Sequence, residues 1–257
     1  MSNLRKLTAL LICVVLVVST LVSCDVLDNL GGDKIDTSKY AAKVRIVFAS
    51  NDDKISPVLD IMNSQSNIEV DGDNIYVKTV AKTNSISILN SYTLIGDSIY
   101  HLTTVDNGVQ SASIREKATF TETDRFLLIS EVGAGSSIDA EDFEVSDKIG
   151  EVDGVKSYNC RNISSDAKLS LEKTLAERFA MIGATVSVKG VTLSLDKKGS
   201  VVMNSVLSCD LEITLDGTVY EVTVRTYTDY SYGADVKIEA PADVADYTDV
   251  SYEDIIG

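Results

Sequence analysis

Apolar and polar residues alternate along much of the chain. Between residues 40 and 48 every second residue is apolar, and the positions between them include Lys43 and Arg45. This period of two is typical of a β-strand with one buried face. The longest such segment is 201–215, and at about 3.3 Å per residue a strand of that length must twist and curl. We therefore expect a curved sheet with a concave, apolar face.

Short turn signals separate the alternating segments. Glycine, and to a lesser degree Asn and Asp, tolerate the positive φ angles of tight hairpins. Repeated signals of this kind between apolar runs predict an up-and-down antiparallel meander. The signals are Asp71-Gly72, Gly96-Asp97, Asn107-Gly108, Asp153-Gly154, Lys198-Gly199 and Asp216-Gly217.

One segment has helical spacing instead. Between 164 and 182 the apolar residues recur every three or four positions, which is the period of an amphipathic helix. Ser164, Ser165 or Asp166 can cap its start and Gly183 can close its end. A helix of this kind is expected to lay its apolar stripe on the concave face of the sheet. The stripe consists of Ala167, Leu171, Leu175, Phe179 and Ile182.

A second, short helix is expected from Val58 to Met62, opened by Ser56 as its cap and Pro57 at its first position. The predicted fold class is therefore mainly β with one or two helices (α+β). In architecture it is a curved antiparallel half-barrel meander with an amphipathic helix over the concave face.

The first residues have the order of a secretory signal. Arg5 and Lys6 precede an uncharged, largely apolar stretch at 7–22, which is followed by the small residue Ser23. The stretch is shorter than the roughly 20 residues that a membrane-spanning helix needs. We expect residues 1–23 to be removed, and the alternative is an uncleaved anchor helix.

Cys24 follows Leu21-Val22-Ser23, which resembles the lipobox of bacterial lipoproteins. That resemblance implies that the Cys24 thiol takes a diacylglycerol and becomes the mature N-terminus. Several acyl chains together hold a protein stably at a bilayer. Residues 24–37 are polar, contain a Gly pair and are expected to form a flexible tether. The predicted location is extracytoplasmic, lipid-anchored to a bacterial membrane, with residues 38–257 as a single domain.

Charge and cysteine content narrow the function classes. The formal net charge of −16 argues against nucleic-acid binding, which needs clustered Lys and Arg. Cys160 and Cys209 would be the only cysteines left to pair, and an extracytoplasmic setting permits a disulfide without requiring it. The single histidine, His101, and the spacing of the cysteines predict no metal site and no cofactor.

In arrangement the chain resembles bacterial lipoproteins of the LolA-like and LppX-like group, over roughly residues 38–245. The resemblance rests on 96–100, on the helix at 164–182 and on 235–243. It implies a lipid carrier built as a curved half-barrel with helices over its mouth. Members of that group are usually basic and freely soluble, whereas this chain is acidic and tethered. A tethered, monomeric protein with a lipid-binding or sensing role is therefore expected in place of a shuttle.

The expected function is binding of a lipid or other apolar ligand in the concave face, without catalysis. The alternative is a structural or protein-interaction module of the cell envelope with a solid core, in which the same residues contact one another. No nucleophile elbow or phosphate-binding loop is present. The expected cavity residues are Leu171, Leu175, Phe179, Met203, Leu207 and Ile213.

A histidine, two Asp clusters and three tyrosines are further candidate functional residues. His101 is expected to face solvent from a strand, because no orienting partner is evident in the sequence. Asp52-Asp53 and Asp71-Gly72-Asp73 lack the spacing of a calcium loop and are expected to be solvated turns. Tyr227, Tyr230 and Tyr232 either pack on a sheet edge, which we favour, or grip a glycan or a partner.

Overall fold

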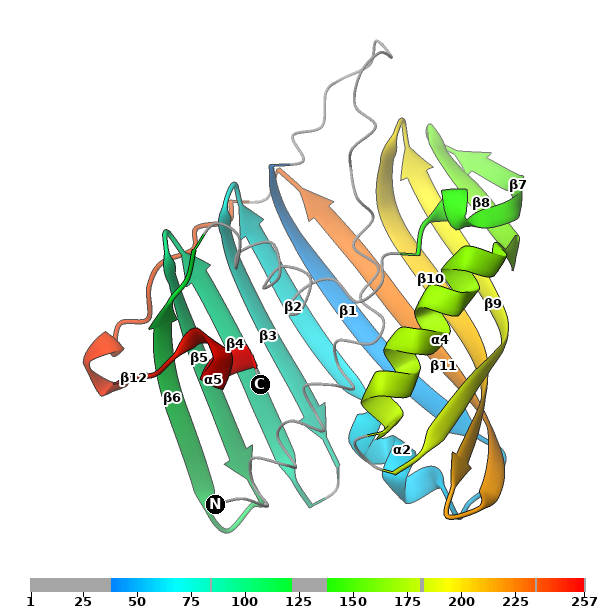
Figure 1. Ribbon diagram of the computed structural model, residues 1–257. Coiled ribbons are helices and arrows are strands. Elements are labelled where there is room, and N and C mark those ends of the chain that lie inside the picture. Colours follow the sequence, from blue (N-terminus) through cyan, green and yellow to red (C-terminus); the bar gives the residue numbers. More distant parts are fainter. Residues whose placement is uncertain (1–37, 84, 122–137, 181–182, 234, 257) are drawn as a thin grey trace.

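The computed structural model describes residues 38–83, 85–121, 138–180, 183–233 and 235–256. In these residues the strands form one open, curved sheet of 12 strands, with three α-helices beside it (Figure 1). The strand order is β12-β6-β5-β4-β3-β2-β1-β11-β10-β9-β8-β7. The strands are β1 (Lys39–Ser50), β2 (Ser64–Asp71), β3 (Asn74–Lys82), β4 (Ser87–Ile95), β5 (Ser98–Asp106), β6 (Ser111–Thr119), β7 (Phe143–Val152), β8 (Val155–Ile163), β9 (Thr185–Lys198), β10 (Val201–Leu215), β11 (Thr218–Tyr232) and β12 (Thr248–Asp249).

All six predicted turns are confirmed as hairpins between consecutive strands. The turn between β7 and β8 shows why the signal works. Asp153 and Gly154 have φ angles of 51° and 78°, the two successive positive values of a type I′ turn. Asp216 and Gly217 repeat this conformation between β10 and β11, with φ angles of 50° and 76°. The local sequence therefore fixes which strands are neighbours within each hairpin.

The sheet consists of two meanders joined along one long pairing. Strands β1 to β6 form the first meander and β7 to β11 the second. Strand β1 pairs antiparallel with β11, from Tyr40 opposite Tyr232 to Ser50 opposite Val222. Val44, Ile46 and Phe48 of β1 are buried on the face that we call the inner face. Because the first strand meets the last strand of the second meander, both halves share one inner and one outer face.

Helix α4 (Ser165–Ala180) lies on the inner, concave face (Figure 1). It packs on β9 through a buried stripe of Leu171, Leu175 and Phe179. The Glu172 side chain also accepts a hydrogen bond from the backbone N–H of Val188, at 2.8 Å. The register of β9 against β10 shifts beside Val188, which marks a β-bulge there. Apolar packing and one charged hydrogen bond thus hold the helix at the bulge.

The start of α4 agrees with the sequence pattern, while Ile182, the last residue of the predicted stripe, lies outside the described residues. Ser164 caps α4 by accepting a hydrogen bond from the N–H of Ala167 at 3.3 Å, and Gly183, with a φ of 75°, follows its end. Helix α2 (Ser56–Met62) is also found, with Pro57 in its first turn. Ser56 is not its cap as predicted, because the N-cap is Ile55, whose side chain makes no capping hydrogen bond.

The end of the chain covers one edge of the sheet, which the sequence pattern did not predict. The segment after β11 passes through the short 3₁₀ helix Val244–Asp246 and adds β12 in parallel to β6. Helix α5 (Tyr252–Ile256) then packs on β6. An edge strand exposes unpaired backbone groups, so this cover protects β6 from pairing with another chain.

The predicted fold class is confirmed as a mainly β protein with a curved sheet and a helix on its concave face. The described residues contain three α-helices where one or two were expected, and the additional one is α5. None of the described helices combines the length and apolar character needed to cross a bilayer. The expected signal segment and tether, residues 1–37, lie outside the described residues.

Candidate functional site

Five of the six residues expected to line a cavity meet in one apolar cluster on the inner face. Their exposed fractions are between 1% and 3%, so almost none of their surface borders a water-sized space. They form a packed wall between α4 and the strands β9 and β10. The five are Leu171, Leu175, Phe179, Leu207 and Ile213.

Met203, the sixth residue, is half-buried and does not belong to that cluster. The sequence pattern places it on the face of Leu207 by simple alternation. The pairing of β10 with β9 shifts in register between Val202 and Asn204, which breaks the alternation at Met203. Because a bulge inserts one extra residue, strand period alone cannot place side chains on both sides of it.

A row of polar side chains crosses the inner face beside this wall, and the sequence analysis did not identify it. The register puts its members directly opposite one another on neighbouring strands, from β10 to β5, with Val44 as the one apolar member. The polar members are all buried. In sheet order the row is Ser205, Thr228, Val44, Ser66, Thr79, Asn90 and Thr103.

Some hydroxyls near this row lack a hydrogen-bond partner. Ser66 and Thr79 bond to each other at 2.8 Å. The hydroxyls of Ser64, Thr226 and Thr228 are buried and have no hydrogen-bond partner among the described residues. Leaving such a group unpaired costs about 1–3 kcal/mol. Ser64 and Thr226 flank Ile46 of β1, so the unpaired groups lie together in the middle of the inner face.

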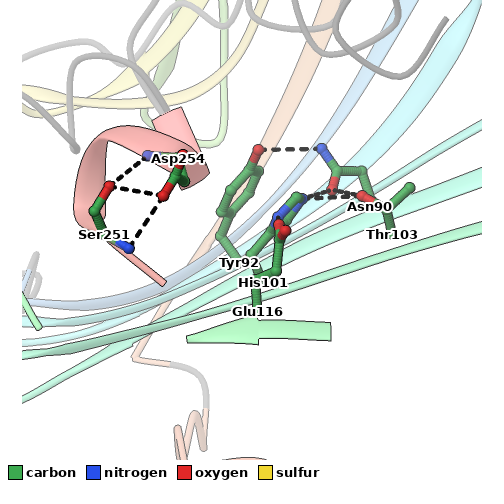
Figure 2. A network of polar contacts seen from close by, with 7 residues as sticks. All are labelled: Asn90, Tyr92, His101, Thr103, Glu116, Ser251 and Asp254. Atoms are coloured by element: carbon green, nitrogen blue, oxygen red, sulfur yellow. Dashed lines mark hydrogen bonds and ion pairs between the residues drawn. The ribbon is translucent and has the colours of Figure 1, made fainter. Parts of the chain in front are cut away.

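His101 is buried, with 5% of its surface exposed, and the expectation that it faces solvent is wrong. Its Nε2 lies 2.7 Å from Oδ1 of Asn90 and its Nδ1 lies 3.3 Å from Oε2 of Glu116. Its ring stacks on Tyr92, with centroids 4.6 Å apart and 7° between the planes. The hydroxyl of Thr103 lies 3.0 Å from Nε2 and donates to Asn90 Oδ1 at 3.1 Å (Figure 2).

This cluster has the order of a hydroxyl, an imidazole and an orienting carboxylate, which is the order of groups in nucleophilic catalysis. The cluster differs from an active site because a substrate could not reach the hydroxyl. Thr103 is 2% exposed, and its hydroxyl is already bonded within the cluster. In this conformation the cluster is therefore a closed hydrogen-bond network that joins β4, β5 and β6.

The remaining candidates are explained by local structure. Asp52 accepts a hydrogen bond from the N–H of Lys54 at 2.9 Å, and Asp71 pairs with Lys39 at 2.7 Å. The described residues contain no group of three or more His, Cys, Asp or Glu side chains placed to share a metal ion. Tyr230 packs against Tyr40 on the inner face, with ring centroids 6.1 Å apart.

Cys160 and Cys209 are both free and buried. They lie on β8 and β10, with β9 between them. Two strand spacings amount to about 10 Å, and a disulfide needs Cα atoms within about 7 Å. The considered disulfide is therefore not formed in this arrangement. Cys24, the expected lipidation site, lies outside the described residues.

Comparisons with known proteins identify no family. No family model matches the chain, and no curated protein matches it. Among solved structures, the dehydratase domain of PpsC from Mycobacterium tuberculosis in complex with C12:1-CoA covers 82% of each chain at 11% identity and a TM-score of 0.16. An inactive D1169N mutant of the CurK dehydratase covers 77% of this chain and 76% of its own at 7% identity and a TM-score of 0.13. TM-scores this low support neither a shared fold nor a shared activity.

Replacing His101 should destabilise the protein strongly. His101→Ala removes the stacking on Tyr92 and leaves Asn90 and Glu116 without their shared partner, so we expect a loss of about 2–4 kcal/mol in unfolding free energy. Urea denaturation followed by circular dichroism measures it. The control Thr104→Ala removes a hydroxyl bonded to Ser113 in an exposed position and should lower stability by less than about 1 kcal/mol. Equal losses would show that the network contributes no special stability.

Burial, aided by the neighbouring Asp210 carboxylate, raises the pKa of the Cys209 thiol from 9.0 to about 12. Iodoacetamide at pH 8 should therefore leave Cys209 unlabelled in the native protein and label it in denaturant, as read by peptide mass spectrometry. Between pH 9.0 and about 12 the unfolded thiol ionises while the folded one keeps its proton, so stability falls as pH rises. Cys209→Ala should flatten that decline, and rapid labelling of native Cys209 would contradict the assigned burial.

Proposed function

We propose that this chain is an extracytoplasmic lipoprotein, anchored through Cys24, that binds an amphipathic ligand of the lipid class on its inner face. The signal-like start and the lipobox-like Leu21-Val22-Ser23-Cys24 support the anchoring. The group of unpaired buried hydroxyls beside an apolar wall supports the binding. The proposed activity is binding alone, without a chemical step.

The ligand chemistry follows from the residues on this face. Thr226 and Thr228 of β11 and Ser64 of β2 lie on either side of β1, and their hydroxyls have no partner within the part of the chain that the structure describes. A hydrogen bond formed away from water is stronger than one at the surface, so a polar head group would gain most here. Leu171, Leu175 and their neighbours are closely packed beside these hydroxyls, so acyl chains would have to part this packing to contact their apolar surface. One molecule with both a polar and an apolar part fits this pair of surfaces.

The placement of the helices supports the same site. Helix α4 packs on β9 and helix α5 packs on β6, on either side of the polar row. Figure 1 shows both helices on one face of the sheet with β1, β2 and β3 between them. The proposed ligand lies along these central strands. The packed cluster under α4 then forms a wall of the site and not its interior.

The double variant Thr226→Val and Thr228→Val tests this proposal. Valine has nearly the shape of threonine without the unpaired hydroxyl, so the empty protein should gain about 1–3 kcal/mol of stability. If the hydroxyls hold a ligand, the same change should lower the amount of lipid retained by the full chain purified from membranes. Native mass spectrometry measures occupancy and urea denaturation measures stability.

Thr192→Val is the matched control, because Thr192 is an exposed residue of β9. This substitution should change neither the stability of the protein nor the amount of lipid that it retains. A double variant that is more stable and retains as much lipid as the original protein would contradict the proposed site. Absence of lipid from both proteins would favour a solid core and a structural role.

A further inference from the structure

The outer face of the central strands carries two hollows that the proposed inner-face function does not use. One has a volume of about 490 Å³ and lies over the ends of β1, β10 and β11. The other, of about 350 Å³, lies over β1, β2, β10 and β11. Tyr227 lines both of them. Volumes of about 300–1,000 Å³ are typical of small-molecule sites.

Tyr227 lies between the hollows, with the Arg45 side chain over its ring. The guanidinium carbon of Arg45 lies 4.4 Å from the ring centroid of Tyr227, in a cation–π contact between β1 and β11. Arg225 is two residues before Tyr227 on the same strand face and pairs with Val47 of β1. Arg45 lines the smaller hollow and Arg225 the larger one. Diagonal neighbours on a sheet lie about 7–8 Å apart, so both side chains start beside Tyr227 and one ligand group above it is within reach of each.

These two arginines differ from others in the described part of the chain. Arg115 and Arg161 each form an ion pair, with Asp243 and Asp147. For Arg45 and Arg225 the described residues supply no carboxylate within ion-pair distance, although the chain has 39 acidic residues. Arginine binds a carboxylate through two parallel hydrogen bonds. The ridge between the hollows is thus a place for an anionic group.

The hollows themselves suit neutral hydroxyls. Asp210, Glu221 and the ion pair of Lys189 with Glu212 line the larger hollow. Lys43, Asn204 and Asp229 line the smaller one. Carboxylates and amides accept hydrogen bonds from sugar hydroxyls, while the same carboxylates repel any negative charge that lies inside a hollow and away from the two arginines. We propose that this outer surface binds an acidic saccharide, with its carboxylate on Arg45 and Arg225 and its neighbouring rings in the two hollows.

The chain therefore has two separate binding surfaces in this account, one on each face of the same strands. Tyr227 belongs to the outer surface, whereas Tyr230 and Tyr232 pack with Tyr40 on the other side. The three tyrosines thus lie on different faces of the sheet, and Tyr227 is the one that lines the outer hollows.

Isothermal titration calorimetry of the full chain in mild detergent tests this inference with two probes of equal length. Hyaluronan tetrasaccharide carries glucuronate carboxylates, and chitotetraose is neutral. We expect the acidic probe to bind at least about tenfold more tightly than the neutral one, and its affinity to fall as salt is added. Equal affinities, or no binding of the acidic probe, would overturn the inference.

Substitutions locate the site. Arg225→Gln and Arg45→Gln should each weaken binding of the acidic probe about tenfold or more, because each removes a charged hydrogen-bond donor. Arg45→Lys keeps the charge but loses the planar stack, so its loss should be smaller than that of Arg45→Gln. Arg45 and Arg225 are exposed, as is Arg161 of the control variant below, so these substitutions should preserve folding.

Arg161→Gln is the matched control, since Arg161 is exposed on β8 and paired with Asp147. It should change the affinity less than twofold. A loss for Arg161→Gln equal to that for Arg225→Gln would show binding by overall charge and would overturn the assigned site. The Thr226→Val and Thr228→Val variant should bind the saccharide normally, which separates this inference from the inner-face proposal.

Discussion

The pairing of β1 with β11 is the constraint on which the rest of the structure depends. It runs without interruption from Tyr40 opposite Tyr232 to Ser50 opposite Val222. Without it the chain would consist of two separate meanders, each with a free edge strand. With it, Val44 and Ile46 of β1 enter the same core as Val224 of β11. The apolar wall under α4 thereby becomes continuous with the inner face of β2 to β5.

Both proposed binding surfaces cross this pairing, on opposite faces. On the inner face, Thr226 and Thr228 of β11 and Ser64 of β2 lie on either side of β1. On the outer face, Arg45 of β1 stacks on Tyr227 of β11. Because successive residues of a strand point to opposite faces, one ladder can present a dry polar row and an open charged ridge at once. A lipid-class guest and an acidic saccharide would meet the same strands without competing.

Local features of the fold were predictable from the sequence, because they depend on neighbouring residues. Turns such as Asp153-Gly154 and Asp216-Gly217 carry their own conformational signal, and α4 is marked by its apolar period and by Ser164 and Gly183. The β1–β11 pairing has no such signal, since it joins segments that are far apart in the sequence. The bulge at Met203 was missed for a related reason, because its position depends on the partner strand.

The burial of His101 shows the limit of polar patterning. Polar residues at alternate positions normally face water, and the pattern at Asn90, His101 and Thr103 gives no sign that they bond to one another. Only the sheet register brings them side by side. The same holds for Arg45 and Tyr227, which are far apart in sequence. Candidate sites of this kind can be recognised only once the order of the strands is known.

Amide hydrogen exchange, resolved by residue, is the most direct measurement of this architecture. If β1 and β11 join the two meanders into one cooperative sheet, the amides that pair Val44 to Phe48 with β11 should exchange as slowly as those within the β10–β11 hairpin. Exchange that is much faster at the amides pairing β1 with β11 than at amides paired within either meander would contradict the account. The polar row on the inner face and the Arg45–Tyr227 pair on the outer face would then not be held by one cooperative sheet.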